Sequence, residues 1–91
     1  MTDALEIRPE RTPNPNALKF STNRTLWEGR PQTFTDPVQA FAFPLARDPL
    51  ALPGVKGVFF LRDFVTVNRE PDADWKAIAV AVERTIRQHV Q

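Results

Sequence analysis

Hydrophobic and polar residues alternate in two stretches early in the chain, which is the pattern of half-buried β-strands. The first predicted strand covers residues 5–9, where proline ends it, and the second covers residues 17–21. A third, weaker extended region spans residues 26–34 and is interrupted by glycine and proline. The pattern therefore predicts two strands and a third extended segment before the middle of the chain.

Residues 36–52 predict a helix in two pieces. Asp36 can accept hydrogen bonds from free N–H groups at a helix start, and Pro37 fits the first helical position, where its missing N–H costs nothing. Pro44 and Pro49 should each interrupt the helix, because an interior proline removes a donor and clashes with the preceding turn. The expected buried face consists of Val38, Phe41 and Ala42.

The clearest hairpin spans residues 55–69, with residues 62–63 as a two-residue turn. In this register one face is entirely apolar. Its pairs are Phe60 with Val65 and Val58 with Val67. The opposite face carries Phe59, Leu61 and Phe64. The turn lacks the glycine or asparagine that favours it, so the sequence does not exclude a shifted pairing of the two strands.

The pattern of residues 74–90 predicts the last helix. Apolar residues recur there at the helical period. They are Trp75, Ile78, Ala79, Val82, Ile86 and Val90. Asp72 or Asp74 can cap its start, and Glu83 with Arg87 has the favourable i, i+4 order. Together the elements predict an α+β fold with a small antiparallel or mixed β-sheet and two helices packed on one face.

Length and charge narrow the class of protein. The 91 residues suit one small domain with a modest core, so we expect a single domain over residues 1–91. A net charge of +1 disfavours a nucleic-acid binder, because phosphate contacts dominate such affinities. No apolar run approaches the ~20 residues that span a bilayer, and the first residues do not resemble a signal peptide. We therefore expect a cytoplasmic protein and no membrane partner.

The residue types needed for most catalytic and metal chemistry are scarce. The sequence has no cysteine, which excludes disulfides, thiolate nucleophiles and thiolate ligation of zinc or iron–sulfur clusters. Its three glycines, at positions 29, 54 and 57, fit neither a GxGxxG motif nor a P-loop, so we expect no nucleotide phosphate cradle. We expect no catalytic residue, no cofactor and no metal site. The alternative is a weak iron carrier that uses oxygen ligands and His89, the only histidine.

The segment from Thr12 to Phe20, TPNPNALKF, interleaves two prolines with two asparagines. Each proline fixes its φ at about −65° and restricts the residue before it, while Asn14 and Asn16 are suited to close a turn. The segment is either a rigid corner between two strands or a preformed polar loop presented to a partner. The two interpretations are compatible, because a loop ordered in advance loses little entropy on binding.

The hairpin face that carries Phe59, Leu61 and Phe64 has two possible environments. If the helices cover only the other face, these side chains form an exposed apolar patch of the kind that marks a protein–protein site. Alternatively, the helix of residues 36–52 or the first strand buries them, because small domains need every apolar contact.

Five motifs follow one another along the chain. They are TPNPNALKF (12–20), PLA (44–46), PGVKGVFF (53–60), DFVTV (63–67) and DW (74–75). In this order and spacing they resemble the N-terminal domain of Nfu/NifU-type iron–sulfur cluster scaffold proteins. In that family the domain usually precedes a second one whose Cys-x-x-Cys pair holds a 4Fe–4S cluster for recipient enzymes. This sequence has no cysteine, so that cluster-holding role carries over to none of its positions, and we expect a free-standing version of the domain.

Two positions depart from the pattern that this resemblance implies. Phe43 stands where the family has a small helix-capping residue, and Pro49 stands where it has leucine. We therefore expect the PLA helix to be shorter here than in the family.

The resemblance also implies a function. We expect a non-catalytic interaction module of iron–sulfur cluster assembly or transfer that docks a cluster scaffold or a recipient protein. The candidate docking residues are Asn14, Pro15, Asn16, Phe59, Leu61 and Phe64. Arg47 and Lys56 would steer an acidic partner.

Overall fold

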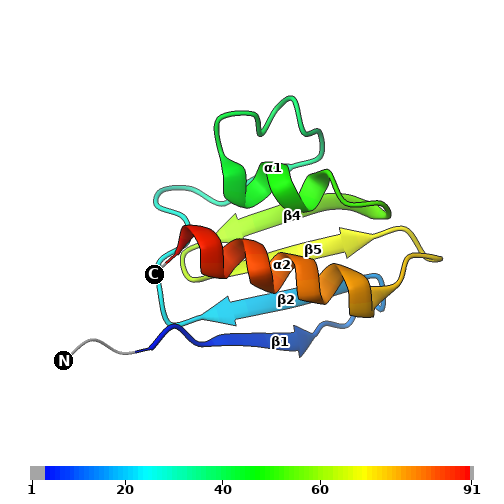
Figure 1. Cartoon of the computed structure of the whole chain (residues 1–91), viewed down its shortest axis with the longest axis horizontal. Helices are drawn as coiled ribbons and strands as arrows, with labels where there is room; N and C mark the ends of the chain where they lie inside the picture. Colours follow the sequence, from blue (N-terminus) through cyan, green and yellow to red (C-terminus); the bar gives the residue numbers. More distant parts are fainter. Residues whose placement is uncertain (1–3, 91) are drawn as a thin grey trace.

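The computed structural model describes residues 4–90, within which it has five strands and two helices. In chain order they are β1 (Ile7–Arg11), β2 (Ala17–Thr22), β3 (Gln32–Phe34), α1 (Pro44–Leu50), β4 (Val55–Leu61), β5 (Phe64–Arg69) and α2 (Trp75–His89). The strands form one antiparallel sheet in the order β1-β2-β5-β4-β3. Both helices lie on the same face of this sheet (Figure 1). The predicted α+β fold is therefore confirmed, with an antiparallel sheet.

The β4–β5 hairpin has the predicted register, with Phe60 opposite Val65 and Val58 opposite Val67. Arg62 in its turn adopts a φ of +51°, a conformation that costs a residue with a side chain some strain. Neighbouring segments hold this turn in place, since the Arg62 carbonyl accepts hydrogen bonds from the backbone N–H groups of Leu26 (2.6 Å) and Trp27 (2.9 Å). These contacts explain why no register slip occurs without a turn glycine.

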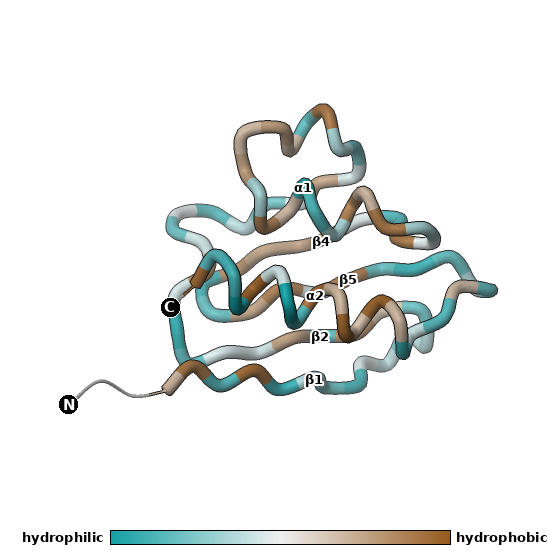
Figure 2. Tube along the Cα trace, viewed as in Figure 1, coloured by the Kyte–Doolittle hydropathy of each residue, from teal (hydrophilic) through white to brown (hydrophobic). Residues whose placement is uncertain are grey.

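One core joins the helices to the inner face of the sheet. The buried side chains of the sheet include Val58, Phe60, Val65 and Val67, and those of the helices include Leu45, Leu50, Ile78, Val82 and Ile86. Along α2 in Figure 2, hydrophobic residues alternate with hydrophilic ones, as a helix with one buried stripe requires. Of the two capping candidates, Asp72 and Asp74, it is Asp74 whose carboxylate caps α2, by accepting from the Lys76 N–H at 2.9 Å.

The two-piece helix predicted over residues 36–52 is correct only in its second part. Asp36 accepts from the Val38 N–H at 2.9 Å, but residues 37–42 form turns and α1 begins at Pro44. Proline disfavours helical backbone at the residue before it, and Phe43 has a φ of −128° and a ψ of 89°. A helix begun at Asp36 therefore cannot continue into α1. Pro49 does not interrupt α1 but lies inside it, one residue before its end.

The buried face expected for residues 36–42 is also wrong. Val38 and Phe41 are 79% and 73% exposed, and Ala42 is exposed, whereas Ala40 is buried. Because these residues form turns, the helical spacing on which the prediction rested does not apply.

The edges of the sheet differ slightly from the predicted strands. Strand β1 continues past Pro9 to Arg11, because an edge strand can place a proline where no ladder hydrogen bond is needed. Only Gln32–Phe34 of the third extended region forms a strand. Trp27 instead packs its ring against Phe43, with ring centroids 5.0 Å apart.

Candidate docking surface

Residues 12–16 form a tight loop that closes on itself. The Asn14 carbonyl accepts from the Ala17 N–H at 3.0 Å, and the Asn14 Oδ1 accepts from the Asn16 N–H at 2.9 Å. The Thr12 hydroxyl accepts from the Asn14 N–H at 3.1 Å. These are the asparagine and threonine turns that the side chains favour next to proline.

The loop is also fixed to the start of α2. The Pro15 carbonyl accepts from the Trp75 indole N–H at 3.2 Å and from Arg69 Nη2 at 3.4 Å. The Arg69 guanidinium lies 4.8 Å from the centre of the Trp75 ring, and its Nη1 donates to the Ala73 carbonyl at 2.7 Å. The loop is therefore a rigid corner, and it leaves Asn14 and Pro15 exposed and Asn16 half-buried.

The outer face of the sheet, opposite the helices, carries the apolar patch, which we define as Phe59, Leu61 and Phe64. Side chains alternate across a strand, so these three point away from the buried Val58, Phe60 and Val65. All three are half-buried, and none packs against the core. The Phe59 and Phe64 ring centroids are 6.3 Å apart. Of the two environments considered from the sequence, the structure has the one in which the helices cover only the other face.

Polar side chains border the apolar patch on the side of β1 and β2. Lys19 Nζ lies 4.3 Å from the centre of the Phe64 ring and 3.9 Å from Glu10 Oε1. Ser21 Oγ donates to the same Glu10 oxygen at 3.2 Å. This gives an apolar centre with a polar rim, which is the usual arrangement of a protein interface.

A polar pocket of about 330 Å³ lies between the loop of residues 12–16 and the start of β4. We call it the amide pocket, after Asn14, Asn16 and Asn68, which line it with Lys56, Thr33 and Arg69 among others. Lys56 is exposed, and it is the extra residue of an irregularity in the pairing of β4 with β5. The structure thus brings Asn14, Asn16 and Lys56 together.

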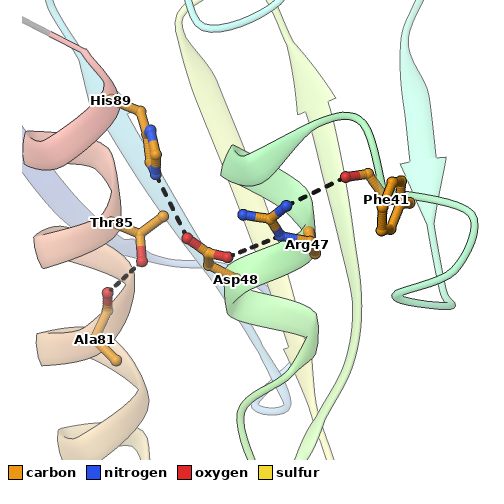
Figure 3. A network of polar contacts seen from close by, with 6 residues as sticks. All are labelled: Phe41, Arg47, Asp48, Ala81, Thr85 and His89. Atoms are coloured by element: carbon orange, nitrogen blue, oxygen red, sulfur yellow. Dashed lines mark hydrogen bonds and ion pairs between the residues drawn. The ribbon is translucent and has the colours of Figure 1, made fainter.

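Arg47 lies elsewhere, on α1 and so on the helix side of the sheet. Its Nε is 3.2 Å from Asp48 Oδ1, and its Nη1 donates to the Phe41 carbonyl at 3.4 Å. Asp48 Oδ2 in turn lies 3.5 Å from His89 Nε2 on α2 (Figure 3). The structure therefore does not bring Arg47 to the loop or to the apolar patch. These side chains are 35–41% exposed, so the contacts between them contribute little to stability.

Within residues 4–90, no three His, Cys, Asp or Glu side chains gather so that they could hold a metal ion. The contact of His89 with Asp48 therefore offers too few ligands, and no observation favours the iron-carrier alternative. In the same part of the chain, no helix has the length and apolar character needed to cross a membrane.

The family model described as "Scaffold protein Nfu/NifU N terminal" matches residues 7–91. The chain belongs to this family. Its relatives include the human protein "NFU1 iron-sulfur cluster scaffold homolog, mitochondrial", which is 42% identical over 81 residues. That match covers 88% of this chain but 32% of the human protein, so the domain spans about a third of that relative's length.

Two solved structures resemble the Nfu/NifU N-terminal domain described here. The crystal structure of protein SAV1430 from Staphylococcus aureus has a TM-score of 0.72 at 30% identity and covers 89% of this chain and 98% of that one. The NifU-like protein from Saccharomyces cerevisiae has a TM-score of 0.80 at 22% identity and covers 99% and 83%. At that identity the yeast likeness shows the fold alone. The family links this chain to iron–sulfur cluster scaffold proteins, as its motifs suggested.

Sequence reasoning missed part of the surface of this Nfu/NifU N-terminal domain. Asn68 and Thr33 line the amide pocket, and Arg69 with Trp75 holds the loop. Asn68 continues the alternation of Phe64 on the outer face of β5, so the period of two contained a signal for it. The Arg69–Trp75 contact has no such signal, because it depends on where α2 begins relative to the loop.

Proposed function

We propose that this domain is a non-catalytic docking module of iron–sulfur cluster assembly or transfer, which binds a cluster scaffold or a recipient protein through the outer face of its sheet. The observation that carries the proposal is the apolar patch, which neither helix covers. Half-exposed aromatic side chains inside a polar rim are suited to act as binding anchors. Asn14, Pro15 and Asn16 extend this surface as a rigid loop, and Lys56 adds a positive charge.

The partner has to supply the cluster ligands. These 91 residues contain no thiolate, so a bound cluster would be held by a Cys-x-x-Cys domain in the same or in a separate polypeptide. The descriptions of the family and of the human relative name scaffold proteins rather than enzymes, which supports a binding role. The cytoplasmic location stays a prediction, because the name of the human relative places that protein in mitochondria.

The test is an NMR titration of the ¹⁵N-labelled domain with a cluster-loaded Cys-x-x-Cys scaffold domain from the same organism. We expect shifts of the backbone amides around Asn16, Phe59 and Phe64. Phe64→Ser should weaken binding at least about tenfold, because loss of a central aromatic anchor removes a large share of binding energy. Its far-UV circular dichroism should stay unchanged, because Phe64 does not pack against the core.

Phe41→Ser is the matched control, because Phe41 is 73% exposed and lies in the loop before α1, where its carbonyl accepts from Arg47 on the helix side of the sheet. It should bind like the wild type. The proposal is overturned if the scaffold causes no shifts at high concentration, or if both serine variants lose affinity equally. Unfolding of Phe64→Ser would instead place this residue in the core.

A further inference from the structure

The amide pocket continues the apolar patch along the same two strands. On β5 the outward-facing residues after Phe64 are Thr66 and Asn68, and on β4 Phe59 is followed toward the pocket by Gly57. Asn68 and Gly57 are paired across the two strands and both line the pocket. A partner segment that lies on the patch can therefore reach the pocket without leaving the outer face.

The charge in the amide pocket is of one sign. Lys56 and Arg69 line it, and none of the nine residues that form its wall is acidic. Arg69 already donates to the Pro15 and Ala73 carbonyls. The Lys56 side chain makes no ion pair or hydrogen bond with any residue between 4 and 90, so its ammonium group is available to a ligand.

The three asparagine side chains of the pocket have amide N–H groups that no residue between 4 and 90 occupies. Asn14 uses its Oδ1 to accept from the Asn16 N–H, which leaves its Nδ2 donor uncommitted. The side-chain amides of Asn16 and Asn68 have no hydrogen-bond partner within the described part of the chain. Because the loop is fixed by Arg69 and Trp75, little entropy is lost when these donors bind a ligand.

We propose that the amide pocket binds the carboxylate of an aspartate or glutamate in an extended segment of the docked partner. This inference rests on the proposed docking function and specifies the chemistry of the partner. Lys56 supplies the counter-charge, and the asparagine amides supply hydrogen bonds, which are strongest when the acceptor is ionised. Phe64 and Asn68 are four positions apart along β5, or roughly 13 Å. The partner segment therefore carries an apolar side chain about four positions from its acidic one.

A synthetic peptide tests the pocket without the scaffold. The probe is acetyl-Phe-Thr-Ser-Thr-Asp-amide, and the control peptide has asparagine in place of aspartate. Both are titrated into the ¹⁵N-labelled domain while the side-chain amides of Asn16 and Asn68 are followed. We expect the aspartate peptide to bind at least about tenfold more tightly, which is the lower end of what one hydrogen bond to a charged group contributes.

Two lysine variants assign this preference to the pocket. Lys56→Gln should weaken the preference for the aspartate peptide without abolishing it, because Arg69 and the asparagine amides remain in the pocket. Lys76→Gln, which removes the same charge from the exposed start of α2, should keep the full preference. Equal binding of the two peptides to the wild type, no binding of either, or an equal loss in both variants would overturn the proposal.

The scaffold titration separates this inference from the docking function. Scaffold binding that is weakened by Phe64→Ser but unchanged by Lys56→Gln would keep the docking function and overturn the carboxylate site. Discrimination between the peptides without any scaffold binding would support the site and overturn the proposed function.

Discussion

Phe43 is at the position before α1, where helices commonly have a side chain that caps their free N–H groups. Its side chain makes no capping hydrogen bond. Instead its ring lies 5.0 Å from that of Trp27 and 5.3 Å from that of Phe60, measured between centroids. At this residue, packing between α1 and the sheet replaces the local stabilisation of the helix end.

Phe43→Ser sets these two effects against each other. A serine cap is worth about 1 kcal/mol, whereas truncating a buried aromatic residue costs about 3–5 kcal/mol. Because Phe43 is only half-buried, we expect the free energy of unfolding to fall by roughly 1–2 kcal/mol on urea denaturation. Phe43→Leu, which keeps an apolar side chain, should lose less. A serine variant more stable than the wild type would show that the cap outweighs the packing.

At the scale of elements, the turn between α1 and β4 packs against the turn between β5 and α2. The Gly54 carbonyl accepts from the Glu70 N–H at 2.7 Å. Gly54 has a φ of +88°, and a Cβ added to it would overlap the Cβ of Ala73. The close contact between these two turns therefore requires a glycine at position 54.

Gly29 allows a matched comparison, because its φ is +97° but nothing lies within 4 Å of an added Cβ. We expect Gly29→Ala to lose about 1 kcal/mol of unfolding free energy from its backbone alone. Gly54→Ala should lose at least about 2 kcal/mol, since the overlap adds to the same strain. Urea denaturation of both variants measures the difference. Equal losses would mean that the turns move apart at little cost.

At the scale of the whole molecule, one core contains side chains from the sheet and from both helices. The two tryptophans report on separate parts of it. Trp27 packs against the rings of Phe34, Phe43 and Phe60, whereas Trp75 lies beside Arg69 at the Pro–Asn loop. If the core is continuous, both parts should unfold together.

The single-tryptophan variants Trp27→Phe and Trp75→Phe test this cooperativity. Within each variant, urea transitions followed by fluorescence and by far-UV circular dichroism should coincide, as two-state unfolding requires. Different midpoints for the two probes in one variant would show that the region around Trp75 and the region around Trp27 unfold separately.

The sequence by itself determined those features for which local periodicity or local chemistry allows one structure. The buried stripe of α2 follows from a period of 3.6 residues, and an aspartate cap at its start follows from local chemistry. The period of 2 predicted the observed pairing of β4 with β5, but only the contacts of Leu26 and Trp27 with Arg62 exclude a slip of that pairing. The five motifs also identified the family. Residues 36–42 escaped prediction because the break at Phe43 leaves a segment too short to form a helix without a buried face, and its Val38 and Phe41 are exposed.

Only the tertiary structure decided which face of the hairpin the helices cover. Both faces are apolar, so the local pattern cannot rank them, and the choice depends on where α1 and α2 pack. The same packing put Lys56 beside Asn16 and Asn68 and left Arg47 on the other side of the sheet. It also placed Trp75 against Pro15, 60 residues away in sequence. Such contacts depend on how elements meet in space, which period and composition within a segment do not contain.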